Sequence, residues 1–224
     1  MAGDPALSFA ADGAELHAGA AASLLPALEA ALAGLPDEQA GIRLHGIPSL
    51  AALLSPNLPI GALAAQTLGA ETRPVRALLF DKTAATNWTL GWHQDRTIVV
   101  QERIDVLGFG PWTTKSGLQH VTPPFALLES MVTLRIHLDP VPADNAPLLV
   151  APGSHRSGRI AEDRIAAVVT HCGTATCLAE RGDVWRYATP ILHASATGNG
   201  SRRRVLQVDY AAAPLPGGLR WLGL

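Results

Sequence analysis

MVTLRIHLD, residues 131–139, alternates apolar and polar side chains. Successive side chains of an extended strand point to opposite faces, so this pattern predicts a strand with one apolar and one polar face. Other short apolar segments, divided by turn residues, occur at residues 75–80, 97–100, 147–151, 176–179, 184–187 and 203–210. Such a series after a helix-rich N-terminal region predicts a mainly β protein with flanking helices, as in a sandwich or jelly roll.

The composition is that of a folded globular protein. Of 224 residues, 48% are hydrophobic and 16% are charged, which argues against disorder. The length predicts one domain over residues 1–224, because it is long enough for one sizeable core and no internal repeat or linker interrupts it. Within it we expect a helical N-terminal region at about residues 18–70 and a β core at about residues 74–212.

Charge and hydropathy narrow the possible partners. The net charge is −2 and the only basic cluster is Arg202-Arg203-Arg204, which predicts no nucleic-acid binding. No apolar stretch has the length of a membrane span, and no secretory signal is present, so no membrane partner is expected. Cys172 and Cys177 are the only cysteines and lack zinc-site spacing. We therefore expect a reducing, cytoplasmic setting. The sequence does not indicate an oligomeric state.

Several local expectations follow from propensity and turn residues. Helices are expected at about residues 21–32 and 49–68, the second broken near Pro56 to Pro59. A short helix is expected near residues 161–165 and a strand at residues 168–172. Residues 103–126 are rich in Gly and Pro, which predicts a long irregular loop of the kind that covers binding sites.

Trp92-His93-Gln94-Asp95 carries the first sign of chemistry. In an extended segment His93 and Asp95 share a face, and an imidazole with a carboxylate can hold a divalent metal. A second, distant histidine would complete the facial triad of two histidines and one carboxylate found in non-haem Fe(II) oxygenases. His193 lies just after a later predicted strand, where a folded sheet can bring it close. Arg203 opens the last strand and can clamp a carboxylate, and the Ser195 hydroxyl can contact the same group.

These motifs, in this order, resemble the phytanoyl-CoA dioxygenase family, whose members are Fe(II)- and 2-oxoglutarate-dependent oxygenases on a double-stranded β-helix, a cupin-like jelly roll. The resemblance covers roughly residues 74–212. It runs through Leu79-Phe80-Asp81-Lys82, Trp92-His93-Gln94-Asp95, Asn145, Pro152-Gly153-Ser154-His155, His193-Ala194-Ser195 and Arg203.

The resemblance implies a site and a reaction. The implied iron ligands, which would also form the catalytic centre, are His93, Asp95 and His193. The implied partners of the 2-oxoglutarate distal carboxylate are Arg203 and Ser195, with Lys82 as a further polar contact to cosubstrate or substrate. Fe(II), 2-oxoglutarate and O2 would then oxidise a small-molecule substrate, with release of succinate and CO2. A carboxylate at position 95 favours hydroxylation, because related halogenases have a small residue there.

Two alternatives remain open on the residues alone. His137-Leu138-Asp139 is a second His-x-Asp pair in a predicted strand, and only the family order favours the first pair. In the arginine triplet, a shift of one residue would turn Arg202 or Arg204 toward the site in place of Arg203.

Other histidines receive simpler interpretations. His155 lies in a tight turn and is expected to hydrogen-bond backbone, and His120 is expected to be a solvated loop residue. Two rival functions also stand beside the oxygenase. One is a non-catalytic jelly-roll sensor that binds metal, and the other is a cupin-type metalloenzyme that does not use 2-oxoglutarate.

Overall fold

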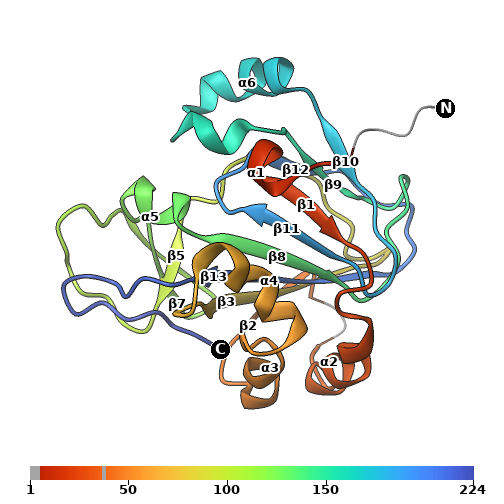
Figure 1. Cartoon of the computed structure of the whole chain (residues 1–224), viewed down its shortest axis with the longest axis horizontal. Helices are drawn as coiled ribbons and strands as arrows, with labels where there is room; N and C mark the ends of the chain where they lie inside the picture. The colour runs from red at the N-terminus through yellow and green to blue at the C-terminus, as the bar shows by residue number, and fades with distance from the viewer. Residues whose placement is uncertain (1–5, 37–38) are drawn as a thin grey trace.

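The computed structural model describes residues 6–36 and 39–224. Its largest element is a six-stranded antiparallel sheet (Figure 1). In spatial order the strands are β1 (Ala14–His17), β11 (Val184–Ala188), β8 (Val132–His137), β13 (Arg203–Ala211), β3 (Arg73–Lys82) and β2 (Gly41–Leu44). The predicted alternating strand is therefore confirmed as β8, between β11 and β13 in the large sheet.

A four-stranded sheet holds the remaining jelly-roll strands. Its order is β10 (Ala175–Cys177), β9 (Leu148–Val150), β12 (His193–Ser195) and β4 (Leu90–His93). Side chains of both sheets line one cavity, described below. This arrangement confirms the mainly β jelly roll expected from the sequence.

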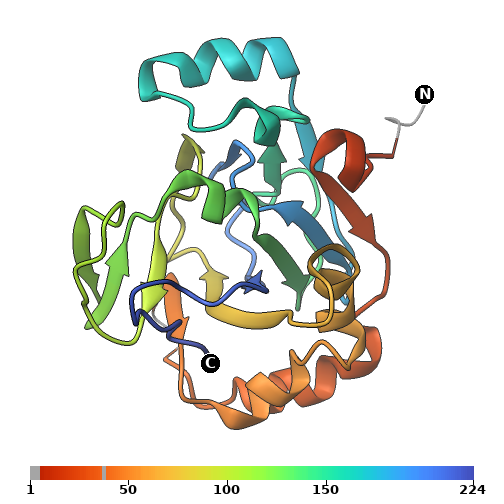
Figure 2. The same cartoon turned by 60° about the vertical axis from the view of Figure 1, so that its left-hand side comes forward.

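A third sheet corrects the expectation of an irregular loop at residues 103–126. It contains β5 (Ile98–Val100), β7 (Leu118–Val121) and β6 (Trp112–Lys115), and lies at the left-hand edge of Figure 2. Ser116 and Gly117 connect β6 to β7 with positive φ angles of 51° and 77°. The Gly and Pro content therefore marks the turns of a small sheet rather than a wholly irregular segment.

The two faces of β8 have different surroundings. Val132, Leu134 and Ile136 pack in one apolar cluster with helical leucines such as Leu28 and Leu50. The opposite face carries Thr133, Arg135 and His137, which are also buried. The polar side chains of this strand therefore face the interior of the jelly roll, since neither face of the strand is open to solvent.

Helices cover the outer face of the large sheet. Figure 1 shows α2, α3 and α4 together on one side of it and α6 at the opposite end of the molecule. The helical segments are α1 (Phe9–Asp12), η1 (Ala22–Leu24), α2 (Leu25–Ala31), α3 (Pro48–Leu53), α4 (Pro59–Leu68), α5 (Phe125–Glu129), η2 (Ser154–Ser157), η3 (Glu162–Arg164) and α6 (Ile165–Cys172). Pro48 and Pro59 occupy first-turn positions, where the missing N–H costs no helical hydrogen bond.

Two local expectations were wrong. β1 and β2 add edge strands within residues 1–70, where only helix or no pattern was expected. Residues 168–172 belong to α6 rather than to a strand, whereas the short helix expected near residues 161–165 is present as η3, which leads directly into α6 at Ile165. Ile165, Val168, Val169 and Cys172 pack on one apolar cluster with Trp92, and their helical spacing explains why a β-branched run became a helix.

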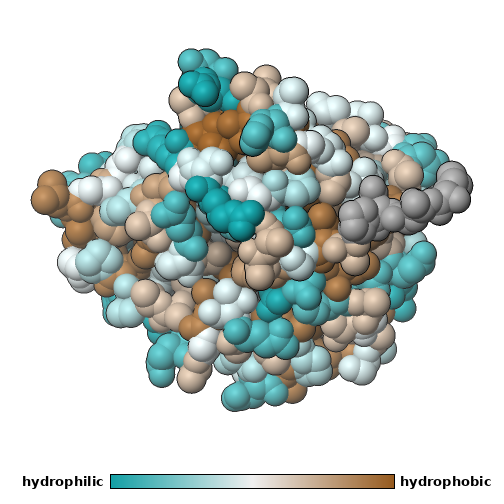
Figure 3. All heavy atoms as spheres, turned by 45° about the horizontal axis from the view of Figure 1, so that its top comes forward, coloured by the Kyte–Doolittle hydropathy of each residue, from teal (hydrophilic) through white to brown (hydrophobic). Residues whose placement is uncertain are grey.

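The outer surface is mixed in character. The face seen in Figure 3 carries hydrophilic and hydrophobic residues in small interspersed patches. Among the described helices the longest has 10 residues, and none is long and apolar enough to cross a membrane.

Candidate metal centre and cosubstrate pocket

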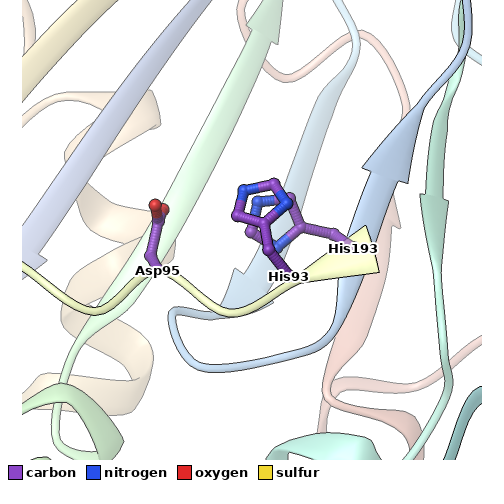
Figure 4. Close-up of side chains that lie close together, drawn as sticks. All are labelled: His93, Asp95 and His193. Atoms are coloured by element: carbon purple, nitrogen blue, oxygen red, sulfur yellow. The ribbon is translucent and has the colours of Figure 1, made fainter. Parts of the chain in front are cut away.

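His93, Asp95 and His193 come together although their sequence positions are far apart. β4 pairs with β12 so that His93 lies opposite His193, with ring centroids 4.2 Å apart. One potential ligand atom from each of the three side chains lies within 4.8 Å of the others. Figure 4 shows the two imidazole rings close together, with the Asp95 carboxylate beside them. The sequence-predicted ligand set is therefore brought to one place.

Both imidazoles are oriented by backbone carbonyls. His93 Nδ1 lies 2.8 Å from the Gly91 carbonyl oxygen, and His193 Nδ1 lies 3.0 Å from that of Ile191. Donation from Nδ1 leaves the Nε2 lone pair free in each ring, which is how metal-binding histidines are usually held. Burial, with His93 nearby, lowers the pKa of His193 to about 4, so this ring is neutral at pH 7.

A partly buried chain of ion pairs supports Asp95. Arg76 Nη2 lies 3.2 Å from Asp95 Oδ2, and Arg76 Nε lies 2.5 Å from Asp209 Oδ2. Thr133 Oγ1 donates to Asp209 at 3.0 Å, which fixes the far end of the chain. Burial alone would raise the pKa of Asp95, but Arg76 and the two histidines hold it below its usual value. Two imidazoles and a carboxylate are the donor set of non-haem Fe(II) centres with open positions, so these residues fit iron.

Arg203 points into the interior, and no described acidic side chain pairs with it. Its side chain is 1% exposed, and among the described residues its Nε and Nη1 have no hydrogen-bond acceptor. Burial, with Arg135 nearby, lowers its pKa to about 9. The small cavity in front of it is lined by Phe80, Lys82, Trp88, Leu90, Arg135, Ser195 and Arg203. A buried guanidinium is costly without an anion, so this cavity fits the distal carboxylate of 2-oxoglutarate.

The other two arginines of the triplet face away. Arg202 Nη2 lies 2.6 Å from Asp81 Oδ2. Arg204 Nη2 lies 2.7 Å from Asp139 Oδ1 and 3.1 Å from Glu29 Oε1. The alternation expected for a strand therefore turns Arg203 toward the cavity, and the alternative registers do not occur.

Ser195 and Lys82 lie beside Arg203, since Lys82 is its cross-strand partner on β3. The Lys82 ammonium donates to the carbonyl oxygens of Trp88 and Ala196, each at 2.7 Å, and to Ser195 Oγ at 3.2 Å. Burial, with Arg203 and Arg135 nearby, lowers the pKa of Lys82 to about 8. All three ammonium protons have acceptors in the protein, so a cosubstrate contact by Lys82 stays a prediction.

Among the described residues, the competing His-x-Asp pair belongs to no cluster of metal-binding side chains. His137 is buried on the inner face, where desolvation and the nearby Arg135 lower its pKa to about 3. Asp139 instead accepts hydrogen bonds from the backbone N–H and the guanidinium of Arg204. His137 therefore faces the interior, whereas Asp139 pairs with Arg204.

Gln94 and His155, the polar neighbours in the motifs, have structural roles. The Gln94 amide donates to the carbonyl oxygens of Gly158 and Pro190 and accepts from the Ile160 N–H. His155 packs so closely on Gly13 that a Cβ there would lie 2.2 Å from its Nδ1. His155 was expected to hydrogen-bond the backbone. For Nδ1 this prediction is wrong, because that atom has no hydrogen-bond partner in the described structure.

A larger cavity of about 170 Å³ opens beside the triad. Its lining includes residues that no sequence motif had marked as site residues: Arg43, Arg76, Lys115, His120 and Arg135. His120 was expected to be solvated, but it is 2% exposed. The only sequence signal for Arg76 and Arg135 is strand alternation, which places each of them on the inward face of its strand, β3 or β8.

Comparison with known proteins supports the family and the fold. A family model described as phytanoyl-CoA dioxygenase (PhyH) matches residues 55–205, which is more than half of the 224-residue chain. No curated protein sequence matches significantly.

Solved structures align over most of the chain. HygX from Streptomyces hygroscopicus, solved with nickel and 2-oxoglutarate bound, is 14% identical over 92% of this chain and 85% of its own, with a TM-score of 0.61. EctD from S. alaskensis, solved with 2-oxoglutarate and 5-hydroxyectoine, is 18% identical over 95% and 78%, with a TM-score of 0.64. AviO1 from Streptomyces viridochromogenes Tue57 is 22% identical over 93% and 95%, with a TM-score of 0.59.

At sequence identities of 14–22%, the structural similarity is evidence for the fold, and it confirms the double-stranded β-helix. The family follows from the sequence match itself. Since that match spans residues 55–205, this chain belongs to the phytanoyl-CoA dioxygenase family and is an Fe(II)- and 2-oxoglutarate-dependent oxygenase.

Proposed function

We propose that this oxygenase hydroxylates a small-molecule substrate, with Fe(II) held by His93, Asp95 and His193. Arg203, aided by Ser195, holds the distal carboxylate of 2-oxoglutarate. The observation that carries this proposal is the pairing of two features in one interior: a triad of ligand atoms within 4.8 Å, and a buried arginine without an anion.

Fe(II) and 2-oxoglutarate, when bound, supply the oxidation: one oxygen atom of O2 goes to 2-oxoglutarate, giving succinate and CO2, and the other to the substrate. The protein contributes geometry. Arg76 keeps the Asp95 carboxylate ionised and oriented, and the carbonyls of Gly91 and Ile191 set the tautomer of the two histidines. The aspartate occupies a ligand position, which favours hydroxylation.

The cavity wall next to the triad is partly apolar, with Leu78, Phe80 and Leu148 in its lining. Such a wall limits water near the reacting centre and strengthens the electrostatic contacts inside it. We propose that residues 1–224 act as one oxygenase domain, because helices of the N-terminal region and the large sheet share one core. The two thiols, Cys172 and Cys177, support a cytoplasmic setting for it.

The rival functions lack a use for Arg203. A metal sensor, or a cupin-type enzyme without 2-oxoglutarate, needs the triad but no buried guanidinium facing the same interior. The orphaned arginine therefore favours a dicarboxylate cosubstrate.

The direct test uses purified protein with Fe(II), 2-oxoglutarate and O2. We expect slow succinate release without added substrate, measured by chromatography. Metal-dependent binding of 2-oxoglutarate is measured separately by equilibrium dialysis with Ni(II). A folded protein that neither binds 2-oxoglutarate with metal nor releases succinate would contradict the proposal.

Arg203→Ala separates the proposal from its rivals. It removes a charge-assisted contact to the cosubstrate, so the 2-oxoglutarate concentration for half-maximal succinate release should rise about 100-fold. Arg159→Ala, at an exposed arginine, is the matched control. An unchanged 2-oxoglutarate requirement in a folded Arg203→Ala protein would refute the assigned role.

A further inference from the structure

The cavity beside the metal triad has basic walls. Arg43 on β2, Lys115 on β6, and Arg135 on β8 line it, together with the buried His120 on β7. Among the described residues that line this cavity, Asp95 is the only carboxylate. Its charge is already shared with Arg76.

The other cations that line the cavity have no anionic partner within the described part of the chain. Arg43 Nη1 donates to the neutral Ser116 hydroxyl at 3.2 Å. Arg135 lies over the Phe80 ring, 5.4 Å from its centroid, and in the described structure its buried Nε has no acceptor. Lys115 lines the cavity, is exposed, and forms no ion pair with the described residues. These positive charges are therefore available to a ligand.

With Fe(II) and 2-oxoglutarate bound, the interior keeps an excess of positive charge, a point that rests on the proposed function. The two charges of Fe(II) balance those of 2-oxoglutarate. Arg76 together with Asp95 and Asp209 adds one negative charge. Three further interior cations outweigh it: Lys82, Arg135 and Arg203. Arg43 and Lys115 add more positive charge at the mouth, so the cosubstrate alone does not neutralise the interior.

We propose that the substrate carries an oxyanion, a carboxylate or phosphate, and that Arg43 and Lys115 bind this group at the cavity mouth. The carbon to be oxidised then lies toward His93 and His193, at the inner end of the same cavity. Positive walls favour an anion and disfavour an amine, so the site selects by charge as well as by shape.

The third sheet holds this mouth in place. Arg43 on the large sheet bonds Ser116 in the β6–β7 turn, which ties the two sheets together where the charges gather. His120 Nδ1 lies 3.1 Å from the Leu118 carbonyl oxygen, which leaves Nε2 free. Burial, with Arg43, Arg76 and Lys115 nearby, lowers the pKa of His120, so a neutral imidazole is available for hydrogen bonding.

The experiment uses matched pairs of probes on the full-length protein with Ni(II) and saturating 2-oxoglutarate. Hexanoate is compared with hexanamide, and hexyl phosphate with hexanol, by ligand-observed NMR at millimolar concentrations. We expect at least one anion to bind at least about ten-fold more tightly than its neutral partner, and binding to weaken with added salt. The two pairs distinguish a carboxylate from a phosphate. Equilibrium dialysis checks that 2-oxoglutarate is retained.

Charge variants locate the site. Arg43→Ala and Lys115→Ala should each weaken anion binding about three- to ten-fold, while Lys115→Arg and the control Arg159→Ala should bind as wild type does. Equal binding of anions and neutral partners, no anion binding at all, or anion binding only through loss of 2-oxoglutarate would overturn the proposal. Wild-type succinate release tests the underlying function separately, so the two failures are distinguishable.

Discussion

His93-x-Asp95 and His137-x-Asp139 share one sequence spacing and have different fates. In both pairs the strand ends at the histidine, so the aspartate lies beyond the regular ladder. Asp95 turns inward to Arg76 on β3, whereas Asp139 turns to Arg204, which faces away from the cavity. The same spacing therefore leaves the carboxylate free to turn to either face of the sheet, and the partner arginine decides whether it faces the cavity or the outside.

The largest expected difference is between the two histidines. His93→Ala removes a proposed ligand and should lower metal affinity and succinate release by about 1,000-fold, more than the roughly 10- to 100-fold typical of outer-shell residues. His137→Ala should retain stoichiometric metal, measured by elemental analysis. If both variants lost metal equally while folded by circular dichroism, the two pairs would not differ as the structure indicates.

A smaller effect is expected at the two partner arginines. Arg76→Ala leaves the partly buried Asp95 and the buried Asp209 without their cation, so metal affinity should fall about 10- to 100-fold. Stability should fall by about 3–5 kcal/mol, measured by urea unfolding. Arg204→Ala is the matched change on the other pair and should leave metal affinity unchanged. An Arg76→Ala protein with wild-type metal affinity would remove the supporting role of this arginine.

The smallest effect concerns Asp139. Its pair with Arg204 is partly exposed, with side-chain exposures of 19% and 25%, so Asp139→Asn should cost only about 0.5–1 kcal/mol at pH 7. Arg204 offsets the desolvation of Asp139 and lowers its pKa in the folded state. The stabilisation is therefore present above the unfolded pKa and is lost as pH falls through the folded one. The difference between wild type and variant should vanish at strongly acidic pH, and a constant difference from pH 7 downward would contradict this ion pair.

Much of the fold was predictable because it follows from short-range periodicity. The alternation at residues 131–139 identified β8, and the proline-bounded segment at residues 49–68 identified α3 and α4. Errors arose where tertiary contacts override local preference. Residues 168–170 are β-branched but belong to a helix, because Val168, Val169 and Cys172 lie on one side of it and pack against a buried apolar cluster. β1 and β2 were missed because edge strands of four residues carry too little pattern.

The site divides in the same way. The sequence alone determined which residue types could form it: two histidines, an aspartate and an arginine in the family's order, lying on or just after predicted strands. Only the tertiary structure decided between the two His-x-Asp pairs and among three arginines. It also revealed the Arg76–Asp209 support and the basic cavity mouth. The physical reason is that a buried charge takes its position from partners on other strands, and no local pattern records which partners the folded sheets bring together.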